Sequence, residues 1–292
     1  MSEWKPGYAG MAGTIDVGGD VTVNRLGLGA MRLTGDGIWG QPANRDEAKA
    51  VLRRAIELGI NFIDTADSYG PHVSEELISE TLYPYPDDLV IATKGGLERT
   101  GPRQWPANGR PEHLIEACEG SLRRLKLDQI PLYQFHRPDP AVPLEDSIGA
   151  LVTLKDQGKI RHIGVSNVTE DQLRRAQRLT PIVSIQNRYN VEDRRSESLI
   201  DLCEQEQMIF LPWAPIQNVD SNRIVRELAQ RYNATPRQIV LAWLLARSPS
   251  TLPIPGTGSV SHIDDNAAAT AIKLTPADVT SITDNSITDN AG

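Results

Sequence analysis

Short apolar runs alternate with longer amphipathic stretches along most of this chain, and this alternation restricts its fold more than any other feature. The apolar runs predict eight strands, at 25–30, 62–65, 90–94, 131–135, 162–166, 182–186, 208–212 and 251–255. They show little polar–apolar alternation, which is typical of parallel strands buried on both faces. The amphipathic stretches predict helices at 45–59, 110–127, 143–159, 169–179, 196–207, 221–232 and 235–248. This order predicts an α/β fold, the (β/α)8 or TIM barrel.

The two ends of the chain add to this pattern. Residues 14–23 predict an N-terminal β-hairpin, because Gly18 and Gly19 separate two β-branched runs and can adopt positive φ. The last two predicted helices follow each other without a strand between them. We therefore expect a single domain over 1–292 with two extra late helices, and a frayed tail at 286–292. An open doubly wound sheet is the alternative fold, but no G-x-G-x-x-G fingerprint leads from the first strand into a helix.

The composition disfavours several classes of function. The 292 residues carry a net charge of −8 without a basic stripe, so neither nucleic acid nor an anionic membrane surface is an expected partner. The chain starts without a secretion-signal pattern and has no apolar run that could span a bilayer, which predicts a cytoplasmic, soluble protein. Cys118 and Cys203 lie in helix-like stretches without metal-ligand spacing, so we expect plain thiols and no metal site.

Four polar residues stand where successive apolar runs end. Asp64 lies at the end of the second run, and Tyr69 comes shortly after that run. Lys94 ends the third run, and His136 directly follows the fourth. A barrel brings the carboxyl ends of its strands to one face, so we expect these side chains to form one catalytic cluster. An acid, a phenol, an amine and an imidazole together suit carbonyl chemistry, in which a proton must reach a carbonyl oxygen.

Each of the four residues has an expected role in the reduction of a carbonyl group. Tyr69 is expected to be the acid, and the nearby Lys94 cation would lower its pKa from about 10. Asp64 would pair with Lys94, and His136 would donate a hydrogen bond to the substrate oxygen. Two alternatives remain open. Each residue taken singly also fits a structural role at the barrel rim, and Lys94 is also a candidate for a Schiff base.

These motifs resemble those of the aldo-keto reductase family, and the resemblance covers nearly the whole chain. The segments that carry it are NFIDTADSYG (61–70), LVIATKGG (89–96) and IPLYQFHRP (130–138). Within the family, the chain is similar to a bacterial branch of pyridoxal reductase-like enzymes. The resemblance implies a barrel with an N-terminal hairpin, the same four catalytic residues, and an NADPH-dependent oxidoreductase that reduces aldehydes or ketones to alcohols.

The resemblance also implies a set of cofactor contacts. It implies Ser166, Asn167 and Gln186 around the nicotinamide amide, Trp213 stacked on the nicotinamide ring, and Ala30 and Met31 in a first-strand loop near the dinucleotide. Around the adenosine 2′-phosphate and adenine it implies Gly256, Thr257, Gly258, Ser259, His262, Asp265 and Asn266. Better-known members carry a lysine and an arginine where this chain has Gly256 and His262, and this loss weakens a charge-assisted grip on the phosphate. Backbone donors and the helix start at 259–261 can still hold an anion, so NADPH is expected first and NADH is the alternative.

The substrate is expected to be a small-molecule aldehyde or ketone that binds among the loops after the strands. Trp39 in 34–42 and Trp105 in 97–109 predict aromatic walls for it, and their alternative role is to pack long loops. A different class of function is a cofactor-binding, redox-sensing or regulatory barrel with incidental turnover. We expect a monomer rather than an oligomer.

Overall fold

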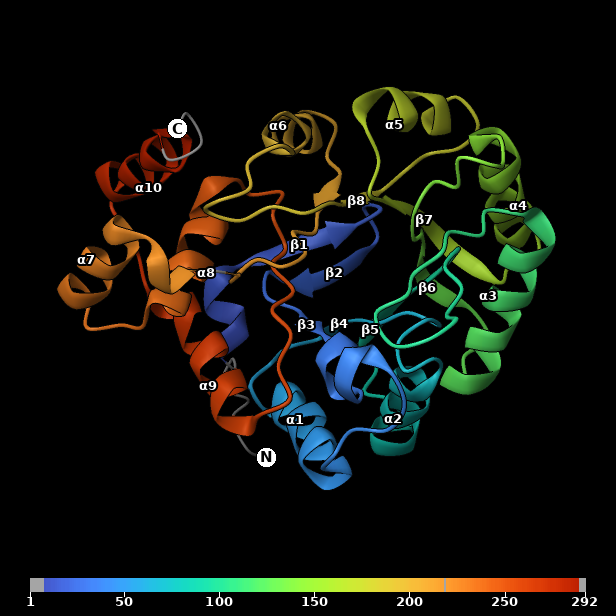
Figure 1. Cartoon of the computed structure of the whole chain (residues 1–292), viewed down its shortest axis with the longest axis horizontal. Coiled ribbons are helices and arrows are strands. Elements are labelled where there is room, and N and C mark those ends of the chain that lie inside the picture. Colours follow the sequence, from blue (N-terminus) through green and yellow to red (C-terminus); the bar gives the residue numbers. More distant parts are fainter. Residues whose placement is uncertain (1–7, 218, 289–292) are drawn as a thin grey trace.

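Short parallel strands form a curled sheet, and the helices are arranged in a ring around it (Figure 1). The computed structural model describes residues 8–217 and 219–288. The sheet has seven strands in chain order, β3 (Leu28–Gly29), β4 (Phe62–Asp64), β5 (Val90–Gly95), β6 (Ile130–Phe135), β7 (Ile160–Ser166), β8 (Ser184–Gln186) and β9 (Ile209–Phe210). The helices around it are α1 (Arg45–Glu57), α2 (Val73–Leu82), α3 (Pro111–Leu125), α4 (Leu144–Asp156), α5 (Glu170–Gln177), α6 (Glu197–Gln205), α7 (Arg223–Arg231), α8 (Pro236–Arg247), α9 (Val260–Ala268) and α10 (Pro276–Thr288). This alternation confirms the predicted α/β barrel type.

The eighth position of the barrel is closed without a regular strand. The sequence predicts a strand at 251–255, but within the described residues the structure has only two isolated bridges here, from Thr251 to Phe210 of β9 and from the neighbouring Gly256 to Gly29 of β3. On one side Leu252 N donates to Phe210 O at 2.9 Å, and on the other Gly27 N donates to Pro253 O at 2.9 Å. The prolines of this segment have no N–H group, so a complete ladder cannot form, although the ring of backbone hydrogen bonds still closes.

Element boundaries differ from the prediction at several places. The predicted strands at 25–30 and 208–212 shorten to the two residues of β3 and of β9. Helix α2 is not predicted, and it starts after His72, whose φ is 70° and whose side chain makes no cap hydrogen bond, so the usual start signal is missing. The extra helices α7 and α8 are confirmed. Helix α10 continues to Thr288 and so enters the tail predicted to be frayed, while 289–292 lie outside the described residues.

The predicted N-terminal hairpin closes one end of the barrel. It consists of antiparallel β1 (Thr14–Val17) and β2 (Val21–Asn24), and Val17 and Val23 pack against apolar side chains inside the sheet. At its turn, Asp20 Oδ1 lies 2.6 Å from Nε2 of His162, near the start of β7. The hairpin therefore covers the N-terminal ends of the strands, and the opposite face is left for a site (Figure 1).

The remaining predictions about the whole chain concern its thiols and its surroundings. Cys118 and Cys203 are buried and free, and burial raises the pKa of both thiols, to about 12 for Cys118. These thiols are therefore protonated and weakly reactive at neutral pH. Among the helices that the structure describes, none combines the length and the apolar composition needed to cross a bilayer.

Candidate active site

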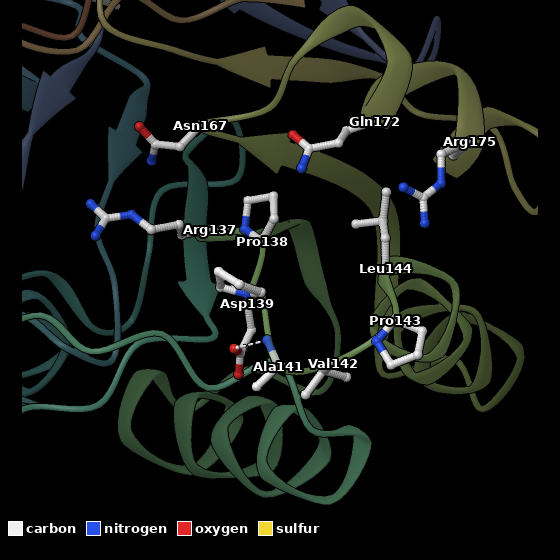
Figure 2. A pocket seen from close by; sticks show the side chains of 11 residues that line it. Arg137, Pro138, Asp139, Ala141, Val142, Pro143, Leu144, Asn167, Gln172 and Arg175 are labelled. Carbon is white, nitrogen blue, oxygen red and sulfur yellow. Dashed lines mark hydrogen bonds between the residues drawn. The ribbon is translucent and has the colours of Figure 1, made fainter.

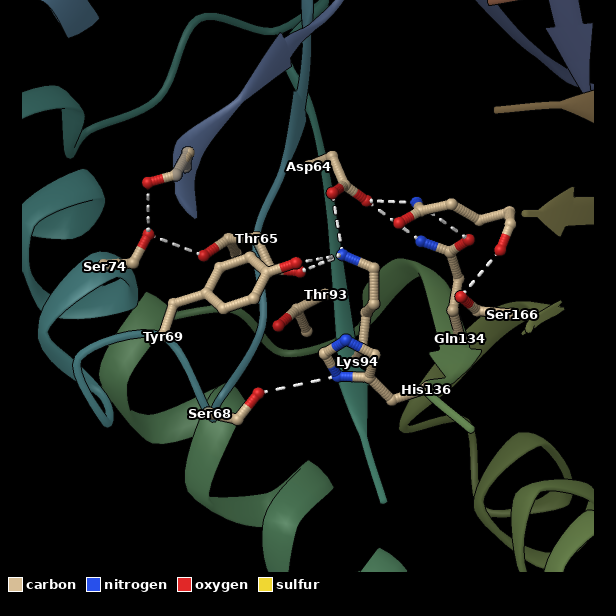
Figure 3. Close-up of polar contacts among 12 residues, drawn as sticks. Asp64, Thr65, Ser68, Tyr69, Ser74, Thr93, Lys94, Gln134, His136 and Ser166 are labelled. Carbon is tan, nitrogen blue, oxygen red and sulfur yellow. Dashed lines mark hydrogen bonds and ion pairs between the residues drawn. The ribbon is translucent and has the colours of Figure 1, made fainter. Parts of the chain in front are cut away.

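The four predicted catalytic residues converge at the carboxyl ends of neighbouring strands (Figure 3). Asp64 is the last residue of β4, Lys94 is next to last in β5, and His136 directly follows β6. Tyr69 comes from the turn between β4 and α2, where its N–H donates to Ala66 O at 3.2 Å. The expected cluster therefore forms because three adjacent strands end at one face and the β4–α2 turn folds back over them.

Lys94 holds the cluster together through its ammonium group. The side chain is fully buried and donates to Asp64 Oδ2 at 2.7 Å, to Thr65 O at 2.8 Å and to Tyr69 Oη at 3.4 Å. Oδ1 of Asp64 accepts from Gln186 Nε2 at 2.8 Å and from a second glutamine amide at 3.1 Å. A buried ion pair is tolerated when its remaining polar atoms are hydrogen-bonded, as they are here.

The state of charge of Lys94 decides between its two candidate roles. Burial lowers the pKa of Lys94, but the Asp64 carboxylate and the Tyr69 phenol raise it by more, so that the pKa lies above its usual value. Lys94 is therefore an ammonium ion at neutral pH. A Schiff base requires a free amine, so the charge state of Lys94 does not support the Schiff-base role.

The structure corrects one expectation about Tyr69. The sequence predicts that Lys94 lowers the pKa of this phenol, but burial raises the pKa of Tyr69 and outweighs the lowering by Lys94. The reason is that the lysine charge is already compensated by Asp64, while the phenol itself is only 7% exposed. Tyr69 keeps its proton at neutral pH, which is the state that a proton donor needs.

His136 is the neutral member of the cluster. Burial lowers the pKa of His136 well below its usual value, and the nearby charges of Lys94 and Arg137 lower it further. Its Nδ1 lies 3.5 Å from Ser68 Oγ, and its ring meets the Tyr69 ring edge-on with centroids 5.9 Å apart (Figure 3). A neutral imidazole cannot protonate a substrate readily, but its N–H group can donate a hydrogen bond into the space beside the phenol.

A cavity of about 920 Å³ opens from this cluster, and we call it the catalytic cavity. Its lining includes the predicted residues Met31, Asp64, Tyr69, Trp105, His136, Ser166, Asn167, Gln186, Trp213, Gly256, Thr257, Gly258 and His262. Lys94 lies buried behind the lining. The predicted cofactor residues Ala30, Ser259, Asp265 and Asn266 are not among the described residues that line it. The volume is at the upper end of the range of roughly 300–1,000 Å³ for small-molecule sites, so an extended ligand fits.

Next to His136, the residues predicted to hold a carboxamide form one linked group. Asn167 has a φ of 58°, and its Nδ2 donates to His136 O and to Ser166 Oγ, both at 3.0 Å. Trp213 Nε1 donates to Asn167 Oδ1 at 3.1 Å, and Ser166 Oγ donates to Gln186 O at 2.7 Å. Asparagine tolerates the left-handed backbone better than most residues. The fold therefore gathers Ser166, Asn167, Gln186 and Trp213 beside the His136 imidazole.

The far end of the catalytic cavity carries positive charges that the sequence analysis missed. Arg32, directly after Met31, and Arg237, in the first turn of α8, line it together with His262. Arg32 lies against the glycine-rich segment, since a Cβ on Gly256 would meet Arg32 Cγ at 3.3 Å. No local sequence pattern marks these two arginines, because they lie in segments far apart in the chain. Their guanidinium groups are suited to phosphate.

The start of α9 is partly occupied by the protein's own groups. Val260 N donates to Oε1 of Glu47 on α1 at 3.0 Å, and Ser259 N donates to Thr257 Oγ1 at 3.0 Å. A carboxylate therefore already accepts from the helix start that the sequence predicts to hold an anion. Its negative charge would oppose a phosphate at this point, in contrast to the arginines nearby.

Comparison with known proteins gives this geometry a family. Residues 25–287 match the Aldo/keto reductase family. The chain belongs to this family. It is 47% identical over 269 residues to an uncharacterized oxidoreductase of Schizosaccharomyces pombe, covering 91% of this chain and 87% of the relative. It is 41% identical over 264 residues to pyridoxine 4-dehydrogenase of Escherichia coli, covering 88% and 92%. Its fold matches the crystal structure of an aldo-keto reductase from Klebsiella pneumoniae in complex with NADPH, with a TM-score of 0.78, 26% identity, and coverage of 93% and 94%.

The two tryptophans predicted as substrate walls of this aldo/keto reductase have different positions. Trp105 lines the catalytic cavity, its ring lies edge-on to Tyr69 at 6.4 Å, and Arg99 Cζ lies 3.7 Å from its centroid. Trp39 is not among the described lining residues; it is 37% exposed and forms a backbone bridge with Gly70. The geometry therefore favours Trp105 as a substrate wall and gives Trp39 a position in the loop outside it.

A second cavity, of about 650 Å³, adjoins the catalytic cavity, and we call it the side groove (Figure 2). It lies between the loop 137–144 and the segment that leads into α5. Arg137 and Asn167 line both cavities. Asp139 accepts from Gly109 N at 3.0 Å and from a second backbone N–H, so that its carboxylate fixes the loop. The side groove therefore extends the space beside His136 toward the surface.

Proposed function

We propose that this protein reduces a small aldehyde or ketone to the alcohol with NAD(P)H, and that Tyr69 is the general acid. The observation that carries the proposal is the chain of contacts from Asp64 through Lys94 to the Tyr69 hydroxyl, which meets the neutral His136 ring at the wall of the catalytic cavity. Membership of the aldo/keto reductase family supports the reaction type.

In the proposed mechanism the carbonyl oxygen lies between the Tyr69 hydroxyl and the His136 ring. NAD(P)H bound in the cavity would supply the hydride for the carbonyl carbon. Tyr69 gives its proton to the oxygen, and His136 donates a hydrogen bond that strengthens as negative charge develops there. The Lys94 ammonium, held by Asp64, stabilises the phenolate that remains, until a proton from solvent restores the phenol.

We propose NADPH as the first cofactor and NADH as the alternative. The residues present fit an anionic dinucleotide, since Arg32, Arg237 and His262 line the far end of the cavity around Gly256. At the near end, Ser166, Asn167 and Gln186 would hold the carboxamide, and the Trp213 ring would fix the face of the nicotinamide. The Klebsiella relative that binds NADPH supports the same choice. Glu47 at the start of α9 opposes it, so both cofactors belong in the test.

Two further proposals concern the whole protein. The oligomeric state is proposed from the family, and the location is proposed from the buried free thiols. We propose that it is a monomer in the cytoplasm. Asp265 and Asn266, in the second half of α9, would face the adenine, and Ala30 and Ser259 would lie behind the cavity lining. Trp105 would contact the carbonyl substrate. No observation specifically favours a redox-sensing or regulatory role. The experiment below therefore includes a result that would indicate such a role.

The deciding experiment measures oxidation of NADPH and NADH in parallel by the wild type and by Tyr69→Phe. Benzaldehyde, pyridoxal and butanal serve as substrates. We expect the variant to lose at least about a hundredfold in kcat, because general acid catalysis contributes about 10²–10⁴-fold, while its affinity for the cofactor changes little. The control is Tyr83→Phe, at an exposed tyrosine that ends α2.

Each result of this experiment has a definite meaning. Equal kcat in the wild type and in Tyr69→Phe would exclude Tyr69 as the acid. Tight cofactor binding with a single slow turnover would favour the regulatory role. A cofactor preference would show which of the opposing charges, Arg32 and Arg237 or Glu47, dominates at the far end of the cavity.

A further inference from the structure

The arginines of the loop after β5 divide into two kinds. Arg99 donates to five backbone carbonyls, among them Ile38 O at 2.7 Å and Ser68 O at 2.8 Å, and so holds the loop in place. Arg110 lies near two glutamates. Arg103, in contrast, forms no side-chain hydrogen bond or ion pair with any residue of 8–217 and 219–288, although it lines the catalytic cavity. Among the described residues, the Arg103 guanidinium group is therefore not used in a structural hydrogen bond or ion pair.

The loop after β6 shows the same division. Arg175, which borders the side groove, is held by both oxygens of Glu145, at 2.8 and 2.7 Å. Arg137 directly follows His136, is exposed, and lines both the catalytic cavity and the side groove (Figure 2). In the described part of the chain it too lacks an ion-pair or hydrogen-bond partner for its side chain. After burial and the Lys94 charge, the Arg137 charge also lowers the pKa of His136, the residue directly before it in the chain.

The charge balance of the catalytic cavity makes these two arginines more significant. The chain as a whole carries a net charge of −8, but the cavity is lined by four arginines and only two carboxylates. One of these carboxylates, Asp64, is already paired with Lys94. Arg32 and Arg237 lie at the glycine-rich end, where a dinucleotide would use them. Arg103 and Arg137 remain as surplus positive charge on the loops beside Tyr69 and His136.

We propose that Arg103 and Arg137 bind an anionic group of the carbonyl substrate, a carboxylate or a phosphate, and that the preferred substrates are aldehydes or ketones that carry such a group. The guanidinium group binds both anions through paired N–H donors in a fixed fork. The side groove offers room for a substituent that reaches past Arg137. This inference rests on the proposed function, since it names the substrate class for the same site.

The test uses matched pairs of substrates that differ in charge. The carboxylate pair is 4-carboxybenzaldehyde and its methyl ester, and the phosphate pair is glyceraldehyde 3-phosphate and glyceraldehyde. For each pair the charge preference is the ratio of kcat/KM for the anionic member to that for the neutral member. The pair with the larger ratio identifies the anion, and we expect a preference of about tenfold or more, since a hydrogen bond to a charged group is worth about that factor.

Variants assign the preference to the two side chains. Arg103→Gln and Arg137→Gln should each remove part of the charge preference, about threefold if the two side chains contribute equally to a tenfold ratio, and the double variant should abolish it. Arg137→Lys should retain an intermediate preference, because it keeps the charge but loses the fork of donors. The control is Arg53→Gln on α1, an exposed arginine outside both cavities, which should leave the ratio unchanged.

A binding measurement separates this inference from the proposed function. Calorimetry of benzoate and of benzyl alcohol with the protein saturated with NADP⁺ reports anion binding without turnover. A wild type without charge preference in either pair, or a ratio that both Gln variants leave intact, would overturn the inference even if all aldehydes are reduced. Absence of turnover together with benzoate binding that Arg137→Gln weakens would instead overturn the reductase proposal and keep the anion site.

Discussion

At the scale of single residues, the site depends on buried groups whose charges are matched. Lys94 is charged although it is fully buried, because Asp64 and a backbone carbonyl satisfy its ammonium group. Asp67, which lies three residues after Asp64 in the turn between β4 and α2, has no such match. Its side chain is buried, with 5% exposed, and its Oδ1 has no hydrogen-bond partner in the described structure. Burial, with the nearby Glu75 charge, raises the pKa of Asp67 to about 8. This carboxyl is therefore protonated at neutral pH.

The raised pKa of Asp67 predicts a pH dependence of stability. The folded state holds this proton up to about pH 8, whereas the unfolded chain releases it near its ordinary pKa of 3.8. The stability is therefore fully present below pH 3.8 and is lost as the pH rises through about 8, at about 1.4 kcal/mol per pH unit between these values. Asp67→Asn should remove this part of the slope.

Urea unfolding between pH 5 and pH 9 measures the slope directly. The control is Asp87→Asn, at an exposed position of the loop between α2 and β5, which should keep the slope of the wild type. The same slope in Asp67→Asn as in the wild type would show that Asp67 is already ionised in the folded protein.

At the scale of elements, the barrel depends on the close approach of β3 to the segment that replaces the eighth strand. A Cβ on Gly29 would lie 2.7 Å from Ile254 O, which is a backbone atom and cannot rotate away. Gly29 has an ordinary φ of −81°, so space and not backbone strain requires glycine here. The same contact positions Met31 and Gly256, which line the catalytic cavity on either side of it.

Gly29→Ala should therefore destabilise the protein by about 1–3 kcal/mol, the usual cost of overpacking, and should also weaken cofactor binding. The matched control is Gly149→Ala in the middle of α4, where an added Cβ would meet nothing within 4 Å. That change should stabilise the protein by about 0.5–1 kcal/mol, because alanine favours the helix. Chemical denaturation and a cofactor titration measure both effects. A neutral result for Gly29→Ala would mean that the closing segment can move away from β3.

At the scale of the whole molecule, exposed apolar residues are dispersed in the described structure. The large hydrophobic side chains that are most exposed are Tyr8, Met11, Trp39, Tyr83 and Leu179. They belong to the N-terminal segment, the loop before α1, the end of α2 and the end of α5. A stable interface between copies usually requires a contiguous apolar patch, which these scattered positions do not provide.

We expect the protein to be a monomer in solution at micromolar concentration. Light scattering coupled to size-exclusion chromatography should give a mass near 32.1 kDa. The value should not change on addition of NADPH, because the catalytic cavity is formed within one chain. A dimer or tetramer mass that persists on dilution would contradict this expectation.

The sequence by itself determined the barrel type, the hairpin and the position of the catalytic cluster. Buried parallel strands have a local pattern of short apolar runs, and a polar residue at the end of such a run has only one face to occupy. For this reason the strand pattern alone places Asp64, Lys94 and His136 together. The carboxamide-binding set was reached in a different way, through motifs that resemble a family.

Only the tertiary structure decided features that depend on contacts between distant segments. The direction of the Tyr69 pKa follows from burial and from the compensation of Lys94 by Asp64, and neither is visible in a local pattern. The closure of the ring at 251–255 depends on backbone hydrogen bonds to two distant neighbours, from Leu252 to β9 and from Gly27 and β3 to Pro253 and Pro255. Arg32 and Arg237 reach the cavity from opposite ends of the chain, and Arg103 and Arg137 are distinguished from other arginines only by the partners that they lack among the described residues. Charge, burial and pairing are properties of the assembled fold, whereas strand and helix patterns are properties of the chain.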